Sequence, residues 1–332
     1  MRARAAFTLL MAIAIHTAPA PPPVLWHDPG AIASLDLSWS DRAHFKPPVP
    51  PFTFLKEDTS GTRAKVRVKD AKGVEWNVKL AGDADDTAEV HAEVAAQRIV
   101  WALGYFVEPG FFVDGGTIAG VKNLHRASRG LTNDGRFRAA RFKEPPHSEA
   151  TGDHWTFKDN PFVGTRELSG LMILMTMINN WDVSANNLGV LHDKESGELR
   201  YVVTDLGASF GHMENVRLPF SIFSTYPWTK WNVHDYQRQT FIDSVHDGRI
   251  RLHFRGEVTM PEIPIEHARW FAGLAIQLTA TQVRQAFEAA GATPAEVNGF
   301  SARFLEKVGD LQTAVSASTG SKGSKGSSRS GS

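Results

Sequence analysis

Hydrophobic and polar positions alternate in short runs through the first third of the chain. Residues 60–68 and 74–80 each alternate apolar with polar side chains, and the glycine-containing turn of residues 69–73 separates them. Such a pattern predicts two half-buried strands joined as a hairpin. Residues 52–55 alternate in the same way, and residues 106–113 and 117–124 are further candidate strands. Together these runs predict a small antiparallel sheet.

Apolar residues at helical spacing occur once between the predicted strands, and they predominate in the second half of the chain. Residues 88–103 carry apolar side chains at helical intervals, with Asp85, Asp86 and Thr87 as a candidate cap and Gly104 as the stop. This pattern predicts one amphipathic helix. Four later segments have the same character: residues 164–178, 264–278, 281–290 and 294–311. The first of them is apolar nearly all round, which predicts a buried helix.

Polar residues gather around a predicted hairpin in the middle of the chain. Asp182 and Asn187 precede a strand-like run at residues 188–191, and a second run at residues 199–203 leads directly to Asp205. A hairpin of these two runs would place both carboxylates and the carboxamide at its open end. Phosphoryl transfer from a nucleotide uses such a set, with one Asp for the hydroxyl proton and an Asn and a second Asp for Mg²⁺.

The spacing Asp-x4-Asn, followed after a hairpin by Asp-x-Gly, resembles the catalytic and metal-binding loops of protein-kinase-like folds. The run from Asp205 to Gly211 looks more like the Asp-x-Gly-x-x-Phe-Gly of the secreted Fam20-type kinases, and the Asp-x4-Asn half is shared with them and with the phosphatidylinositol 3/4-kinase group. Two departures from ordinary protein kinases stand out: no His-Arg precedes Asp182, and Leu206 replaces the usual Phe. The chain therefore resembles an atypical bacterial member of this superfamily.

This resemblance implies an α+β, two-lobed protein-kinase-like fold, with a small antiparallel β lobe containing one helix followed by a mainly helical lobe. It implies ATP with Mg²⁺ or Mn²⁺ as the ligands, Asp182 as the catalytic base, and Asn187 and Asp205 as metal ligands. The nucleotide would transfer its γ-phosphoryl group to a hydroxyl-bearing acceptor, which the sequence does not identify: protein, lipid, sugar and small metabolite stay open.

The small lobe should supply the remaining nucleotide contacts. Lys79 fits the strand lysine that holds phosphates in kinases, and Glu93 fits the helix glutamate that orients it, with Glu89 one turn earlier as the reserve candidate. Gly61 offers a single glycine where kinases carry a glycine-rich loop, so a less glycine-rich turn, or Lys65, would hold the phosphates. The basic residues of segment 126–143 indicate a solvated loop or, alternatively, a contact surface for an anion.

Composition limits the classes of protein that fit. The 332 residues have a formal net charge of zero and are 42% hydrophobic, which suits one large two-lobed domain and disfavours non-specific nucleic-acid binding. With no cysteine, disulfides, thiolate metal sites and cysteine nucleophiles are excluded. Thirteen histidines include no His-x-x-x-His pair, so a zinc enzyme is disfavoured.

The termini carry signals of their own. Residues 1–20 combine two arginines, a short apolar run and small residues before a proline stop, which predicts a signal peptide and a secreted or periplasmic protein. No other stretch reaches transmembrane length. The expected division of the rest is a Pro-rich linker at 21–51, a small lobe at 52–124, a large lobe at 125–314 and a disordered Ser/Gly/Lys tail at 315–332.

Two alternatives to a kinase stay open at this level. A nucleotidyl transferase would use the same residues with the nucleotide reversed. A secreted pseudokinase, which binds a ligand or partner without turnover, would fit the poor glycine loop and the missing His-Arg.

Overall fold

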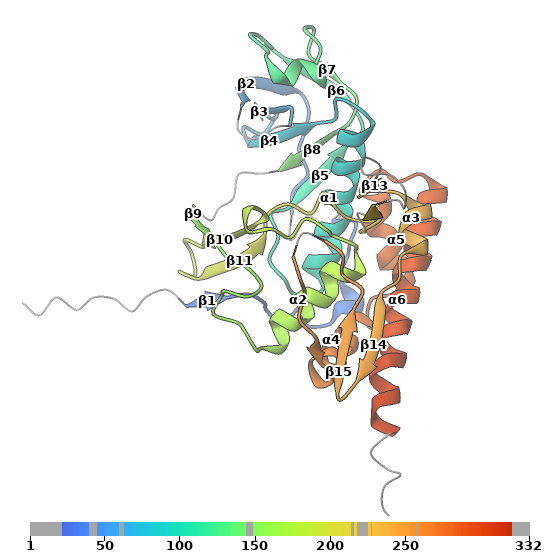
Figure 1. The fold of residues 1–332 in the computed structure, drawn as a ribbon. Coiled ribbons are helices and arrows are strands. Elements are labelled where there is room, and N and C mark those ends of the chain that lie inside the picture. The colour runs from blue at the N-terminus through green and yellow to red at the C-terminus, as the bar shows by residue number, and fades with distance from the viewer. Residues whose placement is uncertain are drawn as a thin grey trace, which may run out of the picture.

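The structure of the protein is a computed structural model that describes residues 22–39, 45–59, 63–143, 149–213, 216–217, 225–226, 228–256 and 258–320. A seven-stranded sheet forms the upper part of the molecule (Figure 1). Its strands lie in the order β5-β8-β4-β3-β2-β6-β7. They are β2 (Phe52–Asp58), β3 (Lys65–Lys69), β4 (Glu75–Leu80), β5 (Gly110–Val113), β6 (Gly116–Ala119), β7 (Arg136–Phe137) and β8 (Ala140–Lys143).

Helix α1 (Ala84–Ala102) crosses from this sheet to the lower part of the molecule (Figure 1). It begins where the Asp83 side chain accepts a hydrogen bond from the backbone N–H of Asp86, as expected of an N-cap. It ends before Gly104, whose φ of +87° suits a residue without a side chain. Side chains on most sides of α1 are buried, so the helix is a central element of the protein.

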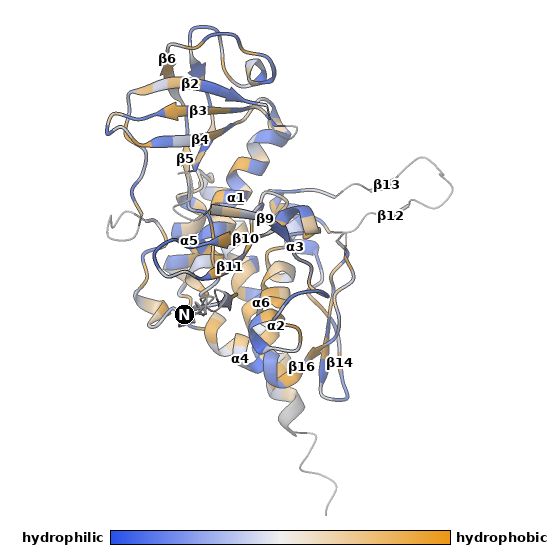
Figure 2. Ribbon diagram, turned by 90° about the vertical axis from the view of Figure 1, so that its left-hand side faces the viewer, coloured by the Kyte–Doolittle hydropathy of each residue, from blue (hydrophilic) through white to orange (hydrophobic). Residues whose placement is uncertain are grey.

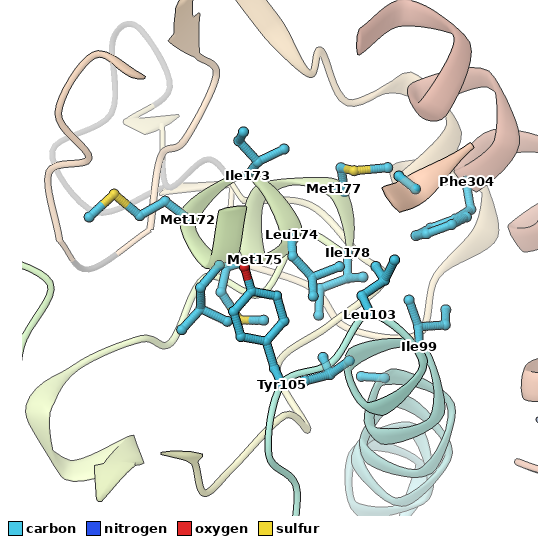
Figure 3. Close-up of a cluster of buried hydrophobic side chains, with 14 of the residues drawn as sticks. Ile99, Leu103, Tyr105, Met172, Ile173, Leu174, Met175, Met177, Ile178 and Phe304 are labelled. Atoms are coloured by element: carbon cyan, nitrogen blue, oxygen red, sulfur yellow. The ribbon is translucent and has the colours of Figure 1, made fainter. Parts of the chain in front are cut away.

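The lower part of the molecule is mainly helical. Its helices are α2 (Arg166–Met177), α3 (Val233–Arg238), α4 (Ile265–Ala275), α5 (Ala280–Glu288) and α6 (Pro294–Gly320). The end of α1 packs on α2, where Ile99 and Leu103 lie near Leu174 and Ile178, with Tyr105 beside them (Figure 3). Buried residues of α1 and of the lower part form one apolar cluster, which holds α1 in place, and the buried residues of the seven-stranded sheet form a second cluster.

Short sheets complete the lower part. β1 (Pro23–Val24), β11 (Leu199–Val203), β10 (Leu188–His192) and β9 (Glu149–His154) form one sheet in that order. β14 (Ile242–His246), β15 (Arg249–Leu252) and β16 (Ile263–Pro264) form another, and β12 (Val216–Arg217) pairs with β13 (Thr225–Tyr226). Three short 3-10 helices, η1 (Ile32–Ser34), η2 (Arg126–Arg129) and η3 (Ala185–Asn187), lie in the connections. Apolar residues concentrate on the inward faces of the helices (Figure 2).

The predicted two-lobed α+β fold is confirmed by this arrangement. The seven-stranded sheet with α1 is the small lobe, and the helices with the short sheets are the large lobe. Among the described residues no helix is long and apolar enough to cross a membrane. The predicted signal peptide lies outside the described residues.

The boundaries of the two lobes differ from those expected from the sequence. The small-lobe sheet continues past residue 124, since β7 and β8 belong to it and β8 lies between β5 and β4. Within the expected large lobe, residues 149–154 form β9. Helix α6 continues to Gly320, beyond the expected start of the tail at residue 315, and residues 321–332 lie outside the described part of the chain.

Residues 22–39 are part of the core, although the sequence suggested a linker there. Leu25, Ile32 and Leu37 are buried, and Trp39 lies under the guanidinium of Arg98 on α1, 4.3 Å from ring centroid to Cζ. Burial lowers the pKa of Arg98 to about 9, against the opposing effect of Asp36. Proline content hid this segment in the sequence because its apolar residues follow no helical or strand period.

Candidate active site

Lys79 is the centre of the site and lies near the end of β4. Its Nζ is 2.8 Å from Glu93 Oε2, 3.0 Å from Glu89 Oε1 and 3.5 Å from Asp205 Oδ2. Burial alone lowers the pKa of Lys79, but Asp205 and Glu93 outweigh burial and raise the pKa above its ordinary value. The lysine is therefore charged and held by three carboxylates from two lobes.

Helix α1 supplies two of those carboxylates. Glu89 and Glu93 are one helical turn apart, so both face β4. The predicted ion pair between Lys79 and Glu93 is present, and Glu89, the reserve candidate, binds Lys79 as well. Each glutamate is buried, with residue exposures of 7% for Glu89 and 1% for Glu93, so neither is the solvated residue of an ordinary helix surface.

Asp205 follows β11 and brings the large lobe into the site. Its Oδ1 accepts a hydrogen bond from the backbone N–H of Gly207, at 2.9 Å. Burial raises the pKa of Asp205, but Lys79, this backbone N–H and Arg141 together lower it to about 2. Gly207 is needed here because a Cβ at this position would lie 2.4 Å from Glu89 Cγ. The turn and α1 therefore fit closely.

Asp182 and Asn187 lie at the other strand of the same hairpin. β10 and β11 are antiparallel, with Leu188 opposite Val203, and the Thr204 N–H donates to the Asn187 carbonyl at 2.9 Å. Asn187 donates from Nδ2 to the Asp182 carbonyl at 3.1 Å, and Asp182 Oδ1 accepts from the Ser184 hydroxyl at 3.2 Å. The hairpin thus brings Asn187 beside the strand end that leads to Asp205, as predicted.

Three cations near Lys79 were not singled out as site residues from the sequence. Arg141 on β8 lies opposite Lys79 in the sheet, and its Nε is 3.4 Å from Glu93 Oε2. Lys230 Nζ lies 2.9 Å from Glu89 Oε2. Arg63 Nη2 lies 2.5 Å from the same oxygen. Arg141 belongs to the basic segment 126–143, and a prediction of β8 would have placed it beside Lys79. Neither Lys230 nor Arg63 lies in a recognisable motif.

Lys65 extends the row of cations across the sheet. It pairs in register with Lys79 on the next strand, as Arg141 does on the other side. Burial lowers the pKa of Lys65, Asp58 opposes this effect, and Lys79 and Arg141 add to it. Gly61 lies outside the described residues.

The donor set suits a hard divalent cation. Asp205 offers a carboxylate, and Asn187 offers a carboxamide oxygen, since its amide nitrogen donates to the Asp182 carbonyl. Carboxylate and amide oxygens are the ligands that Mg²⁺ prefers. Among the described residues no three His, Cys, Asp or Glu side chains are grouped so as to hold a metal ion by themselves. An ion here would also need oxygens from its nucleotide.

No protein-family model matches the chain, and no curated protein does. The solved structures that are similar to it include two kinases. The proinflammatory kinase CtkA of Helicobacter pylori aligns with a TM-score of 0.49 at 11% identity, over 82% of this chain and 99% of that one. The Rio2 kinase of Chaetomium thermophilum, in an ADP/Mg²⁺-phosphoaspartate complex, aligns with a TM-score of 0.30 at 13% identity, over 77% of this chain and 72% of that one.

The two-lobed α+β arrangement that the sequence predicted for a protein-kinase-like fold is present in the structure. A β lobe with one helix, a strand lysine paired with a glutamate of that helix, and an Asp-x-Gly turn after a hairpin of the helical lobe occur together in the structure. The closer kinship with the Fam20-type kinases and the phosphatidylinositol 3/4-kinase group stays a prediction.

Proposed function

We propose that the protein is an exported atypical kinase that transfers the γ-phosphoryl group of ATP to a hydroxyl of a protein, lipid or sugar acceptor. The proposal rests on the contact of Lys79 with both Glu93 and Asp205. Lys79 Nζ, from the small lobe, lies 3.5 Å from Oδ2 of Asp205, which comes from the large lobe. Groups from two lobes that converge in this way match the needs of phosphoryl transfer, which depends on positioning and charge.

Each residue has a role in this proposal. Lys79 binds the nucleotide phosphates, and Glu93 holds its amino group in place. Asp182 accepts the proton of the acceptor hydroxyl, whose oxygen forms a new bond to the γ-phosphorus while the bond to the β–γ bridging oxygen breaks and ADP leaves. Asn187 and Asp205 would hold Mg²⁺ or Mn²⁺, which when bound neutralises charge on the phosphates.

Asp205 is prepared for this role by its surroundings. With a pKa of about 2, it is ionised throughout the neutral range, and its side chain retains 40% exposure, so an ion can reach it. Binding of an ion by Asp205 would weaken its contact with Lys79 and leave the lysine for the phosphates. The predicted signal peptide supports export to a secreted or periplasmic location. This part of the proposal rests on the amino-terminal sequence alone.

Product analysis tests the proposed reaction. Full-length protein would be incubated with ATP, Mg²⁺ or Mn²⁺ and a panel of protein, lipid and sugar acceptors, and products identified by mass spectrometry. A kinase adds one phosphate, and the Asp182→Asn variant should lose this product by orders of magnitude while still binding ATP. Addition of a nucleotide mass would instead identify a nucleotidyl transferase, and ATP binding without any product would identify a pseudokinase.

A further inference from the structure

Glu89 joins the nucleotide site to a distant segment of the large lobe. One carboxylate oxygen, Oε1, contacts Lys79, and the other, Oε2, contacts Lys230 at 2.9 Å and Arg63 at 2.5 Å. Lys230 Nζ also lies 3.0 Å from Asp85 Oδ2 in the first turn of α1. Lys230 therefore binds α1 at two positions, one of which is the carboxylate beside Lys79.

The backbone around Lys230 is attached to the turn that carries Asp205. The Thr229 N–H donates to the His212 carbonyl at 3.2 Å, and the Trp231 N–H donates to the Ser209 carbonyl at 2.9 Å. A Cβ on Gly211 would lie 2.6 Å from the Lys230 backbone nitrogen, so the two segments are in direct contact. Lys230 thus joins α1, which its amino group contacts, to the segment that follows Asp205, which contacts the backbone around Lys230.

Charge makes this bridge relevant to an anionic ligand. Three carboxylates surround Lys79, and phosphates that approach it would meet their negative charge. Burial raises the pKa of Glu89, but Lys79 and Lys230 outweigh burial and lower it, so Glu89 is ionised at neutral pH. Without Lys230, the charge of Glu89 would be offset less completely, a few ångströms from the phosphate-binding lysine.

We propose, on the basis of the nucleotide-binding function above, that Lys230 is a positioning residue of the nucleotide site. By binding Glu89 it offsets the negative charge of that carboxylate beside Lys79, and the segment that follows Asp205 holds the Lys230 backbone in position for this contact. Lys230 acts through Glu89 and needs no contact with the nucleotide itself.

A double-mutant cycle on the full-length protein tests this role, with ATP and Mg²⁺ as the probe and isothermal titration calorimetry as the measurement. Lys230→Met should weaken ATP binding roughly tenfold, the scale expected for one uncompensated charge near an anion. Lys230→Arg, which keeps the charge, should bind like wild type. In the Glu89→Gln background, Lys230→Met should have no further effect. Lys72→Met, in the exposed turn at the other end of the β3–β4 hairpin, is the matched control and should bind like wild type.

The outcomes separate this role from the proposed function. Unchanged affinity in Lys230→Met, or an equal loss with and without Glu89, would overturn the role of Lys230 while wild-type ATP binding stands. Absence of ATP binding by wild type would overturn the proposed function, and the role of Lys230 with it. If Lys230→Met alone does not fold, the comparison of Glu89→Gln with Glu89→Gln/Lys230→Met decides, and equal affinity supports the role.

Discussion

Replacement of Glu93 by Gln should be the most costly single charge change in the site. Glu93 is 1% exposed and contacts Lys79 at 2.8 Å and Arg141 at 3.4 Å. Glutamine keeps the volume, so no cavity forms and the cost is electrostatic. Lys79 keeps Glu89 and Asp205 as partners, whereas Arg141, only 5% exposed, loses the carboxylate that the structure shows beside it.

Removal of one partner from a buried ion pair costs about 3–5 kcal/mol. We expect about 3 kcal/mol for Glu93→Gln, the lower end of that range, because Lys79 retains two carboxylates. Glu89→Gln is the matched control, since its cations keep other partners: Arg63 and Lys230 both retain Asp85. That variant should lose less than Glu93→Gln, because no cation beside Glu89 is left without a carboxylate.

Urea unfolding followed by tryptophan fluorescence would give the free energy of unfolding for both variants. The double variant Glu93→Gln/Arg141→Met should lose less than the two single variants added together, because it leaves no buried guanidinium unpaired. The reasoning would be refuted if Glu93→Gln stayed within about 1 kcal/mol of wild type, the range typical of exposed pairs, or if Glu89→Gln cost as much as Glu93→Gln.

Two further predictions concern the Asp205 turn. The pKa of Asp205 is about 2 in the folded protein, below its ordinary value of 3.8, so its contribution to stability is present above about pH 4 and is lost as the pH falls toward 2. Wild type should therefore lose unfolding free energy more steeply than Asp205→Asn between pH 4 and 2 in urea titrations, and parallel curves would contradict the assigned ion pair. Gly207→Ala places a methyl group against Glu89 Cγ, so it should lower the free energy of unfolding by about 1–3 kcal/mol. It should also weaken ATP binding, and urea unfolding and calorimetry would measure the two effects. A variant as stable as wild type would mean that α1 yields easily at this contact.

Local patterns in the sequence were enough for much of the fold. Five helices (α1, α2, α4, α5 and α6) and the β3–β4 and β10–β11 hairpins follow from apolar periodicity and turn residues, which are properties of neighbouring positions. The strand that carries Lys79 and the helix that carries Glu93 could be placed for the same reason. Their ion pair joins adjacent elements, so a short chain connection limits where the two residues can lie.

Contacts between distant segments could not be predicted in this way. Lys230 reaches Glu89, and Asp205 reaches Lys79, across more than a hundred residues of chain. Only the packing of the two lobes decides such contacts. β8 was missed because its four residues alternate charge with apolar side chains in a basic segment that also suits a solvated loop, and Arg141 was missed with it. The choice between Glu89 and Glu93 had no answer in the sequence because both glutamates face β4.

Metal-dependent ATP binding tests the central claim most directly. Calorimetric titration of wild type and of Asp205→Ala with ATP would be run with Mg²⁺, with Mn²⁺ and with EDTA. We predict that wild type binds ATP with either cation and loses most of its affinity in EDTA, and that Asp205→Ala binds weakly in all three conditions. Equal affinity of wild type and Asp205→Ala in Mg²⁺, or no binding of ATP by wild type under any condition, would contradict the account.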